Sequence, residues 1–307
     1  MNPKHAVASL AALPLMLLTT AAHAVEPAAP SGSPGAPRGE AVEDERLPVA
    51  EAERPMTLPK MILGAELDFD VPHISFGGFG KPTTYANLSL GGSFGVTDDL
   101  TVRAQVLPLQ LTGPAGTGFH YGQDSAYFGG IDNPGPGIGA TYRFAKSETY
   151  EVGVSLDVNL ITVQTVTGAV ITPGIPVRLH FQKKVRIDTG AFLTFTRATE
   201  SVPGGPSLSA NGTGLSIPVS ALYDITEPIH VGVATGFGIA DLSDIGNNTY
   251  IPLGIFAGYA VKGAHGPVLD IDPFFTFPTL LTPGAAAGGT NSATYVVGLS
   301  VGGFLYL

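Results

Sequence analysis

Charged and ionisable side chains stand at alternate positions of otherwise apolar segments, and these are the residues best able to do chemistry. They are Glu66, Asp68, Asp70, Arg103, Arg143, Glu151, Asp157, Arg178, His180, Arg186, Asp188, His230, Asp270 and Asp272. Arginine and carboxylate groups that line a water-filled passage select ions by charge, whereas the same groups paired together form a closed network. We interpret them as selectivity candidates, with a closed structural network as the alternative.

The same residue types give little support to catalysis. G-x-S-x-G occurs at 91–95 and 298–302, but both matches lie inside alternating segments, whereas a nucleophile elbow needs a strand-to-helix turn. A hydrolase acting on membrane lipid would need a histidine on a lipid-facing strand position. We expect His180 and His230 to point inward, and His73, His120 and His265 to lie in loops or turns. We therefore predict no catalytic residues and no cofactor.

Composition restricts the remaining classes of function. The 307-residue chain has no cysteine, which excludes disulfides and cysteine-ligated metals, and we predict no metal site. Its net charge is −10 and its longest basic run is Lys183-Lys184, so a nucleic-acid partner is not expected. Glycine (41) and proline (26) are frequent, and only 13% of residues are charged. An apolar chain with few charges and many glycines is unusual for a soluble globular protein.

From residue 59 onward, apolar residues alternate with small or polar ones, as in Leu63, Leu67 and Phe69 against Glu66 and Asp68. A period of two predicts β-strands with one apolar face. The twelve segments are 61–71, 86–96, 100–106, 138–144, 152–160, 175–181, 185–195, 215–223, 229–237, 251–259, 269–277 and 295–307. Prolines lie near 100–107 and 268–277, so a count of ten or fourteen stays open.

Long and short connections alternate between these segments without exception, and this predicts an all-β fold: a transmembrane antiparallel up-and-down β-barrel of about 12 strands. A soluble sandwich also alternates, but the aromatic residues of the apolar face form two belts, as at membrane interfaces. One belt, near short connections, is Phe94, Tyr142, Phe144, Phe181, Tyr223 and Tyr259; the other, near long ones, is Phe69, Phe195, Phe237, Phe275, Phe277 and Tyr295. The partner of this face is therefore a lipid bilayer.

The strand directions place the charged candidates by height in the lumen. Those expected near the short connections are Arg103, Arg143, Glu151, Arg178, His180, Arg186, Asp188 and His230, and those expected in the other half are Glu66, Asp68, Asp70 and Asp157. Acids at one mouth would attract cations, and an arginine ring at the other would hold anions. In the alternative, Arg103, Arg143, Arg178 and Arg186 pair with Glu151, Asp188, Asp270 and Asp272.

The N-terminal residues are not expected to belong to the barrel. Residues 1–24 carry Lys4, an apolar stretch and Ala22-His23-Ala24, which together predict a cleaved signal peptide. Residues 25–58 are rich in proline, alanine and glutamate, lack aromatic residues, and predict a disordered periplasmic linker. The barrel is expected to span residues 59–307.

The C-terminal residues 300–307 resemble the insertion signal of Gram-negative outer-membrane β-barrel proteins, with Ser300, Gly302, Leu305 and Leu307 at its defined positions. A terminal leucine stands where that family usually has an aromatic residue. Residues 95–100 also resemble a periplasmic turn of transporter-like barrels. The resemblance implies an outer-membrane location, recognition by the barrel insertion machinery, and periplasmic ends for both the mature N-terminus and the C-terminus.

These observations favour a channel or transporter-like barrel for passive passage of small polar solutes or ions. The alternative is a sealed structural or adhesive surface barrel that acts through its extracellular loops. The connection at 108–135 is unusually long, and we expect it either to fold into the lumen or to bind an external partner.

Overall fold

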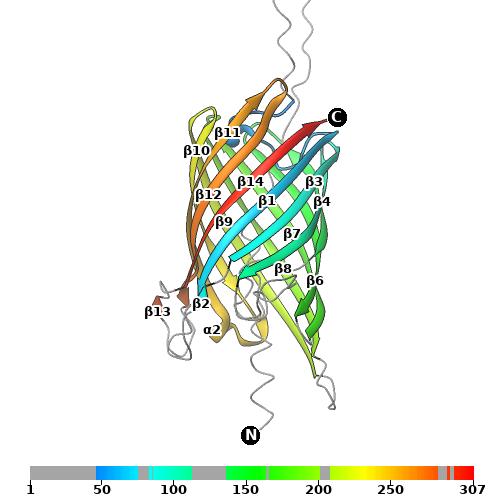
Figure 1. Ribbon diagram of the computed structural model, residues 1–307, viewed down its shortest axis with the longest axis vertical. Helices are drawn as coiled ribbons and strands as arrows, with labels where there is room; N and C mark the ends of the chain where they lie inside the picture. The colour runs from blue at the N-terminus through cyan, green and yellow to red at the C-terminus, as the bar shows by residue number, and fades with distance from the viewer. Residues whose placement is uncertain are drawn as a thin grey trace, which may run out of the picture.

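A computed structural model describes residues 46–74, 83–84, 86–112, 136–163, 166–200, 208–282, 289–290 and 294–307. These residues form twelve long antiparallel strands in one closed barrel (Figure 1). The long strands are β1 (Ile62–Ile74), β3 (Ala86–Thr97), β4 (Leu100–Thr112), β5 (Gly137–Lys146), β6 (Tyr150–Val163), β7 (Val166–Phe181), β8 (Val185–Glu200), β9 (Leu208–Thr226), β10 (Ile229–Ile239), β11 (Thr249–Gly263), β12 (Gly266–Thr282) and β14 (Tyr295–Tyr306). The predicted fold class and strand count are confirmed.

Sequential neighbours pair around the barrel, and two further pairings close it. β1 pairs with β14 as well as with β3, and β12 pairs with both β11 and β14. The two-residue strands β2 (Thr83–Thr84) and β13 (Gly289–Thr290) pair with the ends of β1 and β12. A closed barrel leaves no unpaired strand edge, which is what a sheet needs in order to cross lipid.

The two ends of the barrel differ in the length of their connections. Tight turns of two or three residues, at 98–99, 147–149, 182–184, 227–228 and 264–265, share one end with the C-terminus (Figure 1, top). We call it the short-turn end. At the opposite end lie η3 (Leu242–Asp244) and α2 (Ile245–Asn248). Most of the predicted 108–135 connection lies outside the described residues, because β4 runs to Thr112 and description resumes at 136.

Among the residues described, no helix is long and apolar enough to cross a bilayer.

The outer face of the barrel is apolar and exposed. Large hydrophobic side chains of the predicted outward parity are well exposed, among them Leu67, Ile138, Leu156, Leu193 and Ile255. The aromatic residues Tyr142, Phe144, Phe181, Tyr223 and Tyr259 are exposed near the short-turn end, and Phe69, Phe195 and Phe237 toward the other. An apolar exposed surface that encircles a closed barrel between two aromatic belts is suited to lipid rather than water. The fold is therefore a transmembrane β-barrel.

A charge on this face should destabilise the barrel according to its depth. Leu156 lies midway along β6 and is 50% exposed, so Leu156→Arg is expected to cost about 2–4 kcal/mol of unfolding free energy in lipid vesicles. Phe144→Arg, close to the turn at 147–149, is the control, with an expected cost of about 0–1 kcal/mol. Urea titration of both variants measures the difference. Equal costs at the two sites would show that this face does not meet a bilayer.

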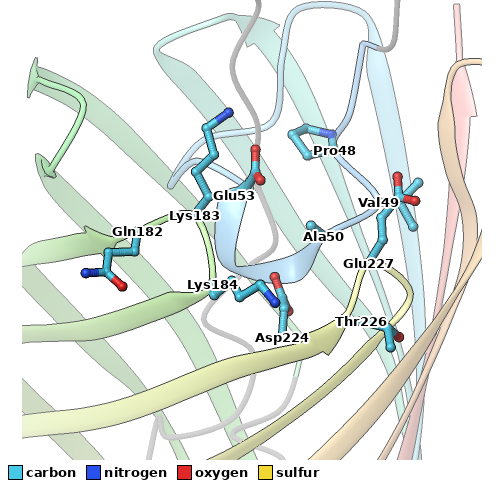
Figure 2. A pocket seen from close by; sticks show the side chains of 10 residues that line it. All are labelled: Pro48, Val49, Ala50, Glu53, Gln182, Lys183, Lys184, Asp224, Thr226 and Glu227. Atoms are coloured by element: carbon cyan, nitrogen blue, oxygen red, sulfur yellow. The ribbon is translucent and has the colours of Figure 1, made fainter.

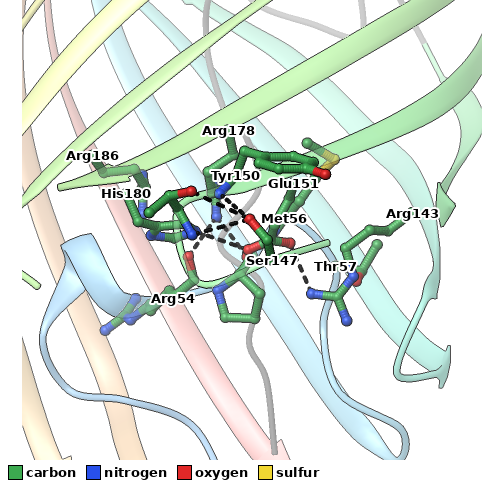
Figure 3. A network of polar contacts seen from close by, with 12 residues as sticks. Arg54, Met56, Thr57, Arg143, Ser147, Tyr150, Glu151, Arg178, His180 and Arg186 are labelled. Carbon is green, nitrogen blue, oxygen red and sulfur yellow. Dashed lines mark hydrogen bonds and ion pairs between the residues drawn. The ribbon is translucent and has the colours of Figure 1, made fainter. Parts of the chain in front are cut away.

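Residues 46–58, which precede β1, lie inside the barrel at the short-turn end (Figures 1 and 3). We call them the plug segment; it contains the short helix η2 (Glu51–Glu53). Leu47, Glu51, Ala52 and Arg54 are all at most 1% exposed. The prediction of a disordered linker over 25–58 is therefore wrong for residues 46–58, and residues 1–45 lie outside the described residues.

Candidate functional site

The strands of the barrel form a wall around the plug segment, and side chains of this wall hold the plug mainly by hydrogen bonds to the plug's main-chain groups. Asp224 Oδ2 accepts from Ala52 N–H at 2.8 Å, Glu151 Oε2 from Met56 N–H at 2.9 Å, and Thr101 Oγ1 from Leu58 N–H at 2.6 Å. These three acceptors come from β9, β6 and β4, so they reach the segment from different parts of the circumference. Inward-facing polar side chains thus give the plug the main-chain hydrogen bonds that a neighbouring strand would otherwise supply.

Donors on the wall satisfy the carbonyl groups of the same segment. Arg178 Nη1 donates to the carbonyls of Arg54 at 2.9 Å and Pro55 at 2.5 Å, and Arg186 Nη1 donates to that of Glu51 at 2.5 Å. Both arginines, seen in Figure 3, also bind Asp188, with distances to its carboxylate oxygens of 2.6 Å from Arg178 Nε and 2.9 Å from Arg186 Nε. The carboxylate of Asp188 fixes the two guanidinium groups in the orientation that the plug needs.

Arg54 is the centre of the plug's own charge network. Its Nη1 lies 2.6 Å from Glu51 Oε2, and its guanidinium donates to both carboxylate oxygens of Asp270 on β12. Glu51 in turn contacts Arg186 at 2.8 Å. Burial lowers the pKa of Arg54, but Glu51 and Asp270 outweigh it and raise that pKa well above its usual value. The guanidinium therefore stays charged, and it lies 5.5 Å from the ring centre of Phe304.

Glu151 joins the plug to two further wall residues. Its Oε2 accepts from Arg143 Nη1 at 2.8 Å, and its Oε1 lies 2.9 Å from His180 Nε2. The other nitrogen of His180 lies 2.9 Å from the carbonyl oxygen of Ala52. Both partner atoms are acceptors, so both bonds form together only when the ring carries two protons. Arg143 also binds Asp99 at 2.8 Å, which ties the network to the first short turn.

A close approach of backbones fixes where the plug enters the barrel. A Cβ atom on Gly95 would lie 1.8 Å from the carbonyl oxygen of Pro59 and 2.6 Å from that of Leu58. Gly95 also accepts a 2.8 Å hydrogen bond from Met61 N–H, where the chain turns into β1. No side chain fits at this position while the segment stays in place.

Gly95→Ala is therefore expected to push the plug segment outward, at a cost of about 1–3 kcal/mol. In this cysteine-free chain, thiol labelling of an Ala52→Cys background reports plug exposure, and we expect the labelling to become faster. Gly91→Ala is the matched control, because a Cβ there meets nothing closer than 3.6 Å. Equal labelling rates in the two variants would contradict a fixed entry path.

The predicted positions of Arg103 and Asp157 along the barrel axis are wrong. The sequence placed them in opposite halves, but Arg103 Nη2 lies 2.8 Å from Asp157 Oδ1 across Gly139, which pairs with both residues. A Cβ on Gly139 would lie only 1.9 Å from Asp157 Oδ1, so the absent side chain leaves room for this contact. Distance from a turn along the chain is a poor measure of height because barrel strands are tilted.

The remaining candidates are spread along the inner wall. His230 Nε2 on β10 lies 3.1 Å from Asp272 Oδ1 on β12, across Gly258 of β11. On the inward parity of β1, Glu66 binds Ser300, Asp68 binds Ser89 and Asp70 binds Asn87, at 3.0, 3.2 and 2.9 Å. The alternative of a paired network thus describes the short-turn end, while β1 presents a separate row of carboxylates.

Sequence reasoning missed the plug's own charged residues Glu51 and Arg54, and the wall residues Asp99, Thr101 and Asp224. A signal existed in the supposed linker: Leu47 and Leu58 are apolar residues that a solvated linker does not need, and they pack with Ile62, Phe304 and Tyr306. Glu51 and Arg54 also have the i, i+3 spacing of a local ion pair.

A further correction concerns His73, which was expected in a loop. It lies in β1 on the outward parity, and its ring stacks on Tyr295 with centroids 5.0 Å apart. Its Nδ1 is 2.8 Å from Thr84 Oγ1. It therefore extends the aromatic belt at the end opposite the short turns. Among the described residues, no group of three or more histidines and carboxylates is arranged to hold a metal ion.

A pocket of about 540 Å³ opens beside the plug at the short-turn end (Figure 2). The plug contributes Pro48, Val49, Ala50 and Glu53; the turn after β7 contributes Gln182, Lys183 and Lys184; and the end of β9 with the turn after it contributes Asp224, Thr226 and Glu227. Gln182 and Lys183 have positive φ angles of 52° and 60° and are the two central residues of the tight turn that the hydrogen bond from Lys184 N–H to Phe181 O closes.

Comparison with known proteins identifies the fold and no family. No family model matches the chain, and no curated protein matches it. Among solved structures, the NanC porin is similar over 77% of this chain and 98% of its own, at 10% identity and a TM-score of 0.50. An outer membrane channel from Pseudomonas putida F1 is similar over 81% and 97%, at 10% identity and a TM-score of 0.52. The chain therefore has the fold of outer-membrane β-barrel channels.

Proposed function

We propose that this protein is an outer-membrane channel for passive passage of small polar solutes, held closed at its short-turn end by the plug segment. The observation that carries the proposal is a closed barrel with an apolar outer face, an inner face of hydrogen-bonded polar groups, and part of its own chain inside. The two similar structures are described as a porin and an outer membrane channel, which supports the same class.

The proposal includes an orientation and a route to the membrane. Residues 1–24 act as a cleaved signal peptide, residues 25–45 are a linker that precedes the plug, and residues 300–307 are recognised by the barrel insertion machinery. The short-turn end, with the C-terminus and the plug, faces the periplasm. The site offers ion pairs and main-chain hydrogen bonds rather than a nucleophile and base, so the proposal contains no catalytic step and no cofactor.

Single-channel recording in a planar bilayer tests the function. We expect infrequent conductance steps from the full chain and frequent steps once the plug is weakened, as in Arg54→Met. Heat-modifiable gel mobility confirms that each barrel is folded. If both proteins insert and remain silent at all voltages, the barrel is sealed, and its function lies in its extracellular loops.

The row of acids on β1 should make the open passage prefer cations. The double variant Glu66→Gln/Asp68→Asn keeps acceptors for Ser300 and Ser89 but removes two negative charges from the lumen. In a salt gradient, the reversal potential of this variant is expected to move toward the equilibrium potential of the anion. Glu227→Gln, at an exposed turn, is the control and should leave the reversal potential unchanged.

A further inference from the structure

We call the space that the plug occupies, together with the wall side chains around it, the recess. These side chains bind mainly the main-chain groups of the peptide inside. Over residues 51–58, side chains of the wall bind the N–H groups of Ala52, Met56 and Leu58 and the carbonyls of Glu51, Ala52, Arg54 and Pro55. Every peptide offers these groups, whatever its side chains. The wall residues Asp224, Glu151, Thr101, Arg186, His180 and Arg178 therefore form a site for a short peptide segment.

Two side chains of the plug make contacts that depend on its sequence, in addition to the main-chain contacts. Glu51 reaches Arg186, and Arg54 reaches Asp270. Glu53, between them, lines the open pocket. The recess therefore favours an acidic residue followed three positions later by arginine.

The contacts are of a kind that another peptide could replace. Inside the recess they are hydrogen bonds and ion pairs, which a second chain can exchange one for one at little net cost. The apolar packing of the plug involves Leu47 and Leu58, which pack with Ile62 against Phe304 and Tyr306. The pocket beside Ala50 gives an incoming chain a place to begin, next to Lys183 and Lys184 (Figure 2).

We propose that the recess is a binding site for short peptides of the pattern acidic-x-x-arginine, and that residues 46–58 are its built-in competitor. Such peptides are then among the polar solutes that the channel handles, and this last point alone rests on the proposed function. Because the plug is tethered, its effective concentration is on the order of millimolar, so a free peptide well below that concentration binds appreciably only when the plug is weakened, and a millimolar peptide competes with the intact plug.

Binding of a synthetic peptide to the full chain tests the inference. In Glu51→Lys/Arg54→Glu, the exchanged charges meet Arg186 and Asp270 as like charges, so the plug should leave while the wall stays unchanged. A fluorescent peptide with the sequence of residues 46–58 is expected to bind this variant at least about a hundredfold more tightly than it binds the wild-type chain, by fluorescence anisotropy. The peptide carrying the same two exchanges should bind the variant at least about tenfold more weakly. Glu53→Lys is the control for an altered charge outside the recess.

A second measurement keeps the plug sequence intact except at one site. In Ala52→Cys, the buried thiol should label faster when millimolar wild-type peptide is added, and not when the charge-exchanged peptide is added. The inference is overturned if a folded double variant binds both peptides equally or neither, or if peptide leaves the labelling rate unchanged. Conductance of the same proteins is recorded separately, so a silent barrel that binds peptide refutes the channel and not the recess.

Discussion

Replacing Arg54 with methionine is expected to free the plug segment from the lumen while the barrel stays folded. The guanidinium is fully buried and faces two carboxylates, Glu51 and Asp270, which would be left without it. Removing one partner of such a buried network costs about 3–5 kcal/mol, because the remaining charge is neither hydrated nor compensated. The expected readout is a rise of more than about a hundredfold in thiol labelling of an Ala52→Cys background, since about 1.4 kcal/mol corresponds to tenfold.

Two further variants separate this effect from general damage. Arg46→Met removes an arginine of the same segment whose side chain, among the described residues, donates to Lys60 O and Leu307 O and to no member of the buried network, so it should change the labelling rate little. Arg54→Lys keeps the charge but not the forked geometry toward Asp270, so an intermediate rate is expected. Loss of heat-modifiable mobility in Arg54→Met would instead mean that the network holds the barrel itself together.

The main effect of the charge network is to fix the position of the plug rather than to increase the free energy of unfolding. Taking several charges out of water costs about as much free energy as their pairing returns. What the pairing does supply is a single arrangement, because Arg178 and Arg186 can meet Asp188 and the plug carbonyls together in few ways. We therefore expect the plug to sit in one place when bound and to leave as a unit when the network fails.

The strands could be predicted because their signal is local. Alternation along Met61–Val71 and its counterparts sets which face meets lipid, and the register in the barrel follows that parity, as in the pairing of Leu67 with Leu90. Prolines did not break the two strands in doubt. Pro108 lies within β4 opposite Ser89, and Pro273 lies within β12 opposite Leu299, so the pairing continues past both.

The interior could not be predicted in the same way, because its contacts join residues far apart in sequence. Arg103 and Asp157 meet only because Gly139, on the strand between them, has no side chain. Arg54 and Asp270 are separated by most of the chain. Low hydrophobicity and many prolines in 25–58 indicate that this segment cannot form a core of its own. They do not reveal that a polar cavity elsewhere supplies the partners that the segment lacks.

If the plug is a gate, fixing it to the wall should abolish conductance altogether. Ala50 and Glu227 line the same pocket from the plug and from the turn after β9, and neither belongs to the buried network (Figure 2). The variant Ala50→Cys/Glu227→Cys, treated with a short bis-maleimide, should therefore hold the plug without disturbing the charges that position it. We expect channel steps before treatment and none after it, a change from open events to complete silence in the same bilayer.

Each single-cysteine variant treated with the same reagent is the matched control and should keep its conductance, since one attached group cannot bridge plug and wall. Mass spectrometry of the treated double variant verifies that the two thiols are joined. Conductance that persists in a fully cross-linked barrel would mean that solutes pass beside the plug rather than through the space it vacates. In that case the row of Glu66, Asp68 and Asp70, and not the recess, would set the rate of passage.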